Sequence, residues 1–179
     1  MSVSLEVEHA RPIRIKTILP RIGKALMGIL NLTYEPEVEA DSIWKPNQEA
    51  GSQESELFTP GVVEGFDVVI KGEEVTVAVF SREEIDYFTV HPRGWRAAAL
   101  GAAVAISIAE HSESEVCDTQ GTYTLKEYMK PDEFAQSIKV DKVFDDINKA
   151  TEYFFYRLPG AVKRESEGAD DNAPYDRLP

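Results

Sequence analysis

"RAAALGAAVAISIAEHSESEVCDTQGTY", residues 96–123, is the most apolar part of the chain and contains its single cysteine. Residues 97–109 carry no charge, but a helix needs roughly 20 apolar residues to cross a bilayer, so a membrane span is excluded. Alanine favours helix and the run contains no proline, which predicts a helix from about Arg93 to His111. Because this helix is apolar on nearly all sides, we expect it to be buried in the core.

Sequence patterns on both sides of this helix predict a sheet. "SVSLEVE", residues 2–8, alternates apolar and polar residues, which is typical of a strand with one solvent-exposed face. "GFDVVIKGEEVTVAVFS" predicts a hairpin with arms Asp67–Ile70 and Val75–Phe80, and the second arm, apolar on both faces, should be a central strand. "IDYFTV", residues 85–90, predicts a further strand. We therefore expect an α+β fold in which a mostly antiparallel sheet packs against the alanine-rich helix and two or three further helices.

Two of those further helices are visible in the sequence. "PRIGKALMGIL" predicts an amphipathic helix that opens at Pro20 and turns Arg21 and Lys24 outward. A last helix should begin near Asp141, with an acidic start that suits a helix N-terminus. We expect residues 1–160 to form one domain and residues 161–179 to be a flexible polar tail.

Residues 35–64 are the candidate partner-binding region. They hold eight acids, one lysine and three prolines with little periodicity, which predicts a long, mostly irregular acidic loop. Aromatic anchors supply affinity in protein interfaces and surrounding carboxylates steer a basic partner. The candidate contact residues are Glu37, Glu39, Asp41, Trp44, Glu49, Glu54, Glu56 and Phe58.

Charge narrows the classes of partner. The net charge is −13, so phosphate backbones and anionic lipid should repel the chain, and we expect neither nucleic acid nor membrane as partners. A basic partner protein is favoured instead. The charge is uneven, because residues 1–30 hold five basic residues against two acids. The start of the chain has no apolar run after its basic residues, and with a single cysteine this predicts a cytoplasmic protein.

Catalytic signals are few. Cys117 follows His111 by six residues, so a thiol and an imidazole would meet if the helix end folded back over the next strand. A lone cysteine in a short apolar strand is more often packing material. Asp118 begins "DTQG", whose aspartate and glycine suit the ends of a type I turn.

Metal and cofactor signals are weaker still. The three histidines are scattered, and the chain has no phosphate-binding or dinucleotide-binding glycine loop, no HExxH and no GxSxG. We therefore expect no metal site and no cofactor.

The stretch from Gly65 to Tyr123 resembles small α/β proteins of bacterial toxin–immunity systems. It shares their order of a hairpin, an alanine-rich helix, a short strand "EVCD" and a turn "TQGTY", and it departs from them at "SESE", where a glycine is expected. The resemblance implies a non-catalytic inhibitor that binds a toxin protein, and it implies no functional residue. We predict a non-catalytic protein-binding protein with a basic partner. A small enzyme with a Cys117/His111 thiol site and a non-catalytic subunit of a larger assembly are the alternatives.

Overall fold

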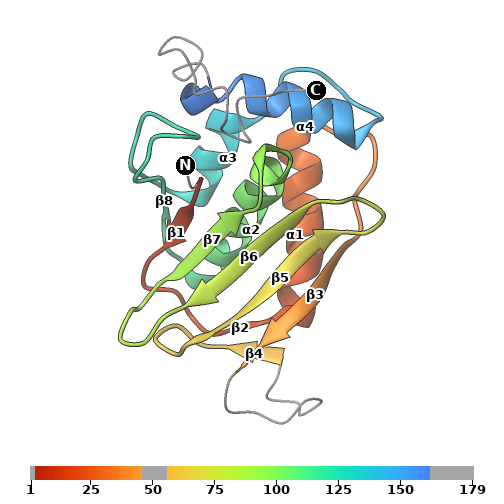
Figure 1. Ribbon diagram of the computed structural model, residues 1–179. Helices are drawn as coiled ribbons and strands as arrows, with labels where there is room; N and C mark the ends of the chain where they lie inside the picture. The colour runs from red at the N-terminus through yellow and green to blue at the C-terminus, as the bar shows by residue number, and fades with distance from the viewer. Residues whose placement is uncertain (1–2, 46–55, 162–179) are drawn as a thin grey trace, which may run out of the picture.

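The computed structural model describes residues 3–45 and 56–161, which form an antiparallel sheet backed by helices (Figure 1). Seven strands pair antiparallel in the order β3-β5-β6-β7-β1-β8-β9. Their bounds are β1 Leu5–Val7, β3 Val38–Trp44, β5 Glu64–Ile70, β6 Thr76–Ser81, β7 Phe88–Pro92, β8 Val116–Cys117 and β9 Tyr128–Met129. Two short strands, β2 Ile13–Arg14 and β4 Leu57–Phe58, form a separate two-stranded sheet.

The helices lie on one side of the large sheet. They are α1 Ile15–Leu30, α2 Ala98–Ser112, α3 Pro131–Ile138 and α4 Ile147–Tyr156, and a short 3₁₀ helix, Trp95–Ala97, precedes α2. Figure 1 shows α1 and α2 behind strands β3, β5, β6 and β7, whose other face carries no helix. The predicted α+β class is confirmed.

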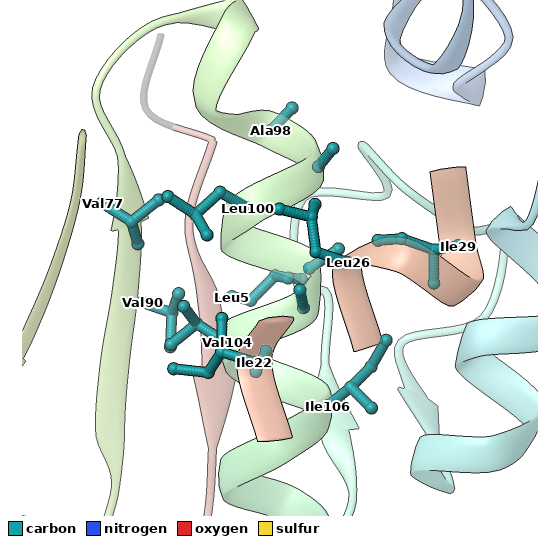
Figure 2. Close-up of a cluster of buried hydrophobic side chains, with 14 of the residues drawn as sticks. Leu5, Ile22, Leu26, Ile29, Val77, Val90, Ala98, Leu100, Val104 and Ile106 are labelled. Atoms are coloured by element: carbon teal, nitrogen blue, oxygen red, sulfur yellow. The ribbon is translucent and has the colours of Figure 1, made fainter. Parts of the chain in front are cut away.

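Helix α2 is the centre of the core, as its sequence predicts. Thirteen of its fifteen residues are buried. Figure 2 shows Leu100 and Val104 of α2 between strand residues such as Val90 and the α1 residues Ile22 and Leu26. Nearly every side of α2 is therefore covered, which explains the absence of a polar stripe. Among the described residues, no helix is long and apolar enough to span a membrane.

The turn after β8 also matches its prediction. The buried Asp118 carboxylate accepts backbone N–H bonds from Thr122 at 3.1 Å, Tyr123 at 2.7 Å and Thr124 at 2.9 Å. Gly121 has a φ of 62°, a left-handed conformation that glycine adopts without steric cost. Asp118 thus organises the loop.

Three helix boundaries differ from the prediction. Helix α2 begins at Ala98 rather than near Arg93, because Trp95–Ala97 form a 3₁₀ helix. Helix α1 begins at Ile15 rather than at Pro20, which lies inside it. Helix α4 begins at Ile147 rather than near Asp141, because the preceding segment is bent and Phe144 is held in an isolated bridge with Leu32, where its N–H donates to the Asn31 carbonyl at 3.0 Å. Asp146 caps α4 by accepting from the N–H groups of its first turn.

The prediction of a mostly irregular loop over residues 35–64 is wrong at residues 38–44, 57–58 and 64, which form strands, and residues 46–55 lie outside the described part of the chain. The segment contains β3, β4 and the first residue of β5. Val38, Glu39 and Ala40 pair with Ile70, Val69 and Val68, so tertiary pairing overrides the low strand propensity of Glu39. A β-bulge shifts the register between Ala40 and Ile43. The predicted tail, apart from residue 161, lies outside the described residues.

Candidate functional site at the edge of the sheet

Strand β3 is an edge strand. It is seven residues long and stands first in the strand order, with β5 on one side only. No strand in the described part of the chain pairs with its other side. A free edge presents unpaired backbone N–H and C=O groups to which an extended segment of another chain can add.

Large apolar side chains are exposed at the end of β3 and just before β5. The exposed fractions of Ile43, Trp44, Val62 and Val63 are 47%, 53%, 48% and 39%. Trp44 and Val63 line one hollow together, whereas Ile43 pairs with the buried Phe66 and so points to the other face of the sheet. Exposed apolar residues that meet on one face mark interaction sites more often than single exposed residues do.

Trp44 borders a hollow on the uncovered face of the sheet. It pairs with Gly65, which pairs with Phe80, so the three residues lie side by side on neighbouring strands. A Cβ atom on Gly65 would lie 2.7 Å from the Val79 carbonyl oxygen, so only glycine fits there. The hollow beside Gly65 has a volume of about 430 Å³ and suits an apolar side chain of a partner.

Three predicted contact carboxylates stand on or beside the same strand. Glu37, Glu39 and Asp41 are exposed. The Lys71 Nζ lies 3.1 Å from Glu37 Oε1 and 3.8 Å from Glu39 Oε1, and its hydrogen bond with Glu37 raises the Lys71 pKa. The first half of β3 therefore keeps a net negative charge, whereas Trp44 lies at the other end of the strand, where Asp67, Arg82 and Arg93 line the hollow with it.

The remaining predicted contact residues are Phe58, Glu56, Glu49 and Glu54, and none of them lies on the exposed edge of β3 in the described structure. Phe58 is fully buried and its ring centroid lies 4.6 Å from that of Phe66, so the prediction of an exposed anchor at Phe58 is wrong. The reason is that β4 pairs with β2 and closes one end of the core. Glu56 is bound to Lys16 at 3.1 Å. Glu49 and Glu54 lie outside the described residues.

The structure contains a buried ion pair just after β3 that the sequence analysis does not predict. Lys45 Nζ lies 3.2 Å from Glu64 Oε2, and each side chain is only 7% exposed. Lys45 also donates to the Leu57 carbonyl, and the Thr59 N–H donates to Glu64 Oε1 at 2.6 Å. These bonds join β3, β4 and β5. The signal in the sequence is that Lys45 is the only lysine among the eight acids of residues 35–64.

The structure gives the thiol alternative no support. Cys117 is 1% exposed, and burial raises its pKa to about 11, whereas a nucleophile needs a lowered pKa and access to solvent. Its side chain is hydrogen-bonded with Tyr128. The His111 ring instead lies 2.9 Å from the Pro12 carbonyl oxygen through Nε2.

Cys117 is therefore expected to alkylate slowly. At pH 7 a thiol with a pKa near 11 is about 0.01% thiolate, so iodoacetamide should label the folded protein at least about 100-fold more slowly than the protein in urea. The rate should rise about tenfold per pH unit up to pH 10 if the fold persists. Mass spectrometry of quenched samples measures both. Equal rates in folded and unfolded protein would contradict the buried thiol.

One group of side chains in the described ranges has metal-ligand spacing. Ligand atoms of Glu6, Glu8 and Cys117 lie within 4.8 Å of one another. The Tyr128 hydroxyl donates to Glu8 Oε1 at 3.3 Å, and burial is the main reason that the Glu6 pKa is raised. A metal would have to displace the proton that the thiol holds firmly, so we assign no metal here.

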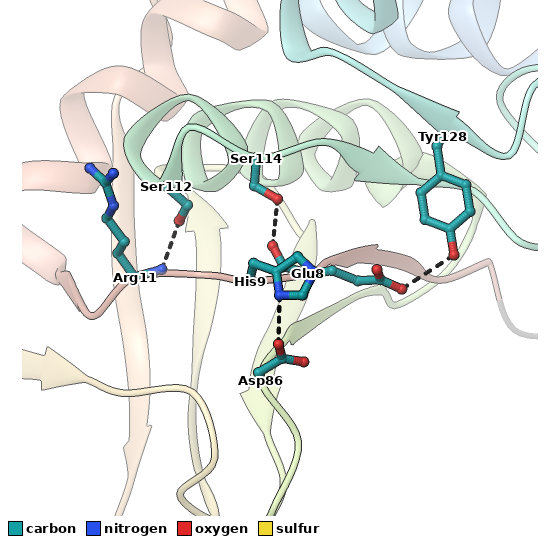
Figure 3. A network of polar contacts seen from close by, with 7 residues as sticks. All are labelled: Glu8, His9, Arg11, Asp86, Ser112, Ser114 and Tyr128. Carbon is teal, nitrogen blue, oxygen red and sulfur yellow. Dashed lines mark hydrogen bonds and ion pairs between the residues drawn. The ribbon is translucent and has the colours of Figure 1, made fainter.

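A second acidic surface lies at the end of α2. Figure 3 shows the polar network beside it, in which the Ser114 hydroxyl donates to the Glu8 carbonyl and His9 Nδ1 lies 2.7 Å from Asp86 Oδ2. The neighbouring cleft, about 790 Å³, is lined by five carboxylates, Glu8, Glu110, Glu113, Glu115 and Asp132. Glu110, Glu113 and Glu115 are near neighbours in the chain, but Glu8 and Asp132 join them only through the fold, which is why the sequence pattern does not reveal the cleft.

Comparison with protein-family models, with curated proteins and with solved structures finds no match for this chain. Function is therefore inferred from its own residues and their geometry.

Proposed function

We propose that this chain is a non-catalytic protein-binding protein, and that a basic partner adds an extended segment to the free edge of β3. The observation that carries the proposal is an unpaired strand edge that has the exposed carboxylates Glu37, Glu39 and Asp41 along its first half and the exposed Trp44 at its end. Backbone hydrogen bonds would supply affinity, the Trp44 ring would anchor the partner, and the carboxylates would steer its approach.

The charges favour a partner of a different kind from the chain itself. A second copy pairing through β3 would bring three more carboxylates to the same edge, and like charges on facing strands destabilise a sheet. A segment rich in lysine or arginine would meet the opposite charge there. The acidic cleft at the end of α2 would strengthen long-range attraction to the same basic partner.

The finer form of the proposal follows the sequence resemblance. Immunity proteins of bacterial toxin systems inhibit a toxin protein by binding it, and we propose a cytoplasmic inhibitor of a basic toxin as the specific role. The alanine-rich helix α2, the hairpin β5–β6 and the short strand β8 are the elements that carry this resemblance.

Charge reversal at the edge tests the proposal. Replacing Glu37, Glu39 and Asp41 together by lysine should slow association with the partner isolated from the native host by about tenfold or more at low salt. The effect should shrink at high salt, because ions screen exposed charges. Stopped-flow or surface plasmon resonance measures the rates, and thermal melting should hardly change, since exposed charges add little stability.

A matched variant gives the control. Glu83, Glu127 and Glu133 are exposed and lie outside both β3 and the acidic cleft, so replacing them by lysine adds the same charge elsewhere. The control should slow binding much less than the edge variant. If the edge variant binds at the native rate at every salt concentration, or the control slows binding as much as the edge variant does, the partner does not bind on β3.

A further inference from the structure

A groove bordered by basic side chains, in contrast to the acidic edge of β3, lies on the helical side of the molecule. It has a volume of about 380 Å³ and runs between α1 and α3 over α2. Its apolar lining is Ala25 and Ile29 of α1, Ile106 of α2 and Ala135 of α3. The volume is at the lower end of the range for small-molecule sites.

Three cations border this groove. Arg21 and Lys24 stand on α1 and Lys139 follows α3, and all three are exposed. Within residues 3–45 and 56–161, no ion pair joins any of them to a carboxylate. Glu110 is the only carboxylate in the lining. In a chain with a net charge of −13, a groove edged by cations that have no carboxylate partner in the described ranges can bind an anion.

Gly28 gives a second, independent observation. It lies in the last turn of α1 with open space beside it, since an added Cβ would meet nothing within 4 Å. Gly23 in the same helix is different, because its Cβ would lie 2.8 Å from the Pro36 carbonyl oxygen. Glycine weakens a helix relative to alanine, yet no contact within the described chain requires it at Gly28. The surface at Gly28 is therefore open, and only a side chain much larger than alanine would fill it.

We propose that this groove binds a small aliphatic carboxylate. Arg21, Lys24, Ala25 and Gly28 follow the helical spacing of three and four, so they stand on one face of α1 over a rise of about 10 Å. The carboxylate binds at Arg21 and Lys24, and the chain lies along the apolar lining over Gly28 toward Lys139. This site is separate from β3 and does not depend on the proposed protein partner.

Octanoate is the probe, titrated into the full chain and followed by amide chemical shifts. Saturable shifts at Ile29, Ile106 and Ala135 are expected. Octanol, which has the same chain without the charge, should bind at least about tenfold more weakly, because a charge-assisted hydrogen bond contributes about one to two powers of ten.

Two variants locate the site. Gly28→Phe should fill the open space and abolish saturable binding, while Gly28→Ala should keep binding and melt no lower than the native protein. Replacing Arg21 and Lys24 together by serine should weaken octanoate binding about tenfold or more and leave octanol unaffected. Absence of saturable shifts in the native protein, or equal octanoate binding by folded Gly28→Phe, would overturn the proposal.

Discussion

With aspartate in place of Ala102, the protein is expected to lose about 5 kcal/mol of its free energy of unfolding at pH 7. Ala102 is 0% exposed and lies in the middle of α2. Keeping the new carboxyl protonated from a normal pKa near 4 up to pH 7 costs about 4 kcal/mol. Burying it without a partner adds about 1–3 kcal/mol. Since domains are stable by only about 5–15 kcal/mol, the variant should be partly or wholly unfolded.

Urea unfolding at two pH values tests this account. Burial raises the pKa of the new carboxyl in the folded state above its unfolded value, so stability is lost as the pH rises above about 4. The loss should therefore be smaller at pH 4 than at pH 7. The control Glu110→Asp changes an exposed position of the same helix and should cost less than about 0.7 kcal/mol. A soluble Ala102→Asp variant with native stability would show that α2 is not the core.

Removing one member of the buried Lys45–Glu64 pair is expected to cost about 3–5 kcal/mol. Glu64→Leu leaves the Lys45 ammonium buried without its carboxylate and leaves the Thr59 N–H without its acceptor. Because the pair joins three strands, β3 should also become more mobile than β6. Denaturant unfolding measures the cost, and hydrogen exchange at β3 amides measures the local loosening.

The double variant separates charge burial from packing. Replacing Lys45 by methionine together with Glu64→Leu removes both charges and keeps most of the volume, so it should recover most of the lost stability. The remaining loss should be about 1–2 kcal/mol, from the unpaired Thr59 N–H. Single variants that cost less than about 1 kcal/mol would show that the pair is open to water.

The parts of the fold that the sequence predicts are those fixed by local pattern. Helix α2 follows from a run of small and aliphatic residues, the β5–β6 hairpin from two apolar arms around a turn, and the Asp118 turn from the chemistry of its end residues. In each case the residues that decide the structure are neighbours in the chain. The register between distant strands, such as Leu5 opposite Val90, is not readable in this way.

The candidate site was predictable only in part, for the same reason. Composition points to Trp44 and the carboxylates Glu37, Glu39 and Asp41, and the structure has them on or beside one edge strand. The burial of Phe58 is not predictable in this way, because it depends on pairing with β2, more than forty positions earlier. The groove between α1 and α3 cannot be predicted from the sequence. Lys139 lies near Arg21 and Lys24 only because α3 packs beside α1 in the fold.

The place of β1 in the sheet has a consequence for synthesis. This strand precedes its partners β7 and β8 by a long stretch of chain. Leu5 cannot pair until Val90, roughly 85 residues later, has been synthesised. At about 5–20 residues per second, the ribosome needs roughly 4–17 s to deliver that partner. During this interval the apolar residues Val3, Leu5 and Val7 have no sheet to join. We expect the nascent chain to be most vulnerable to aggregation during this interval. The sheet should form completely only late, when β1 pairs between β7 and β8, which are synthesised long after it.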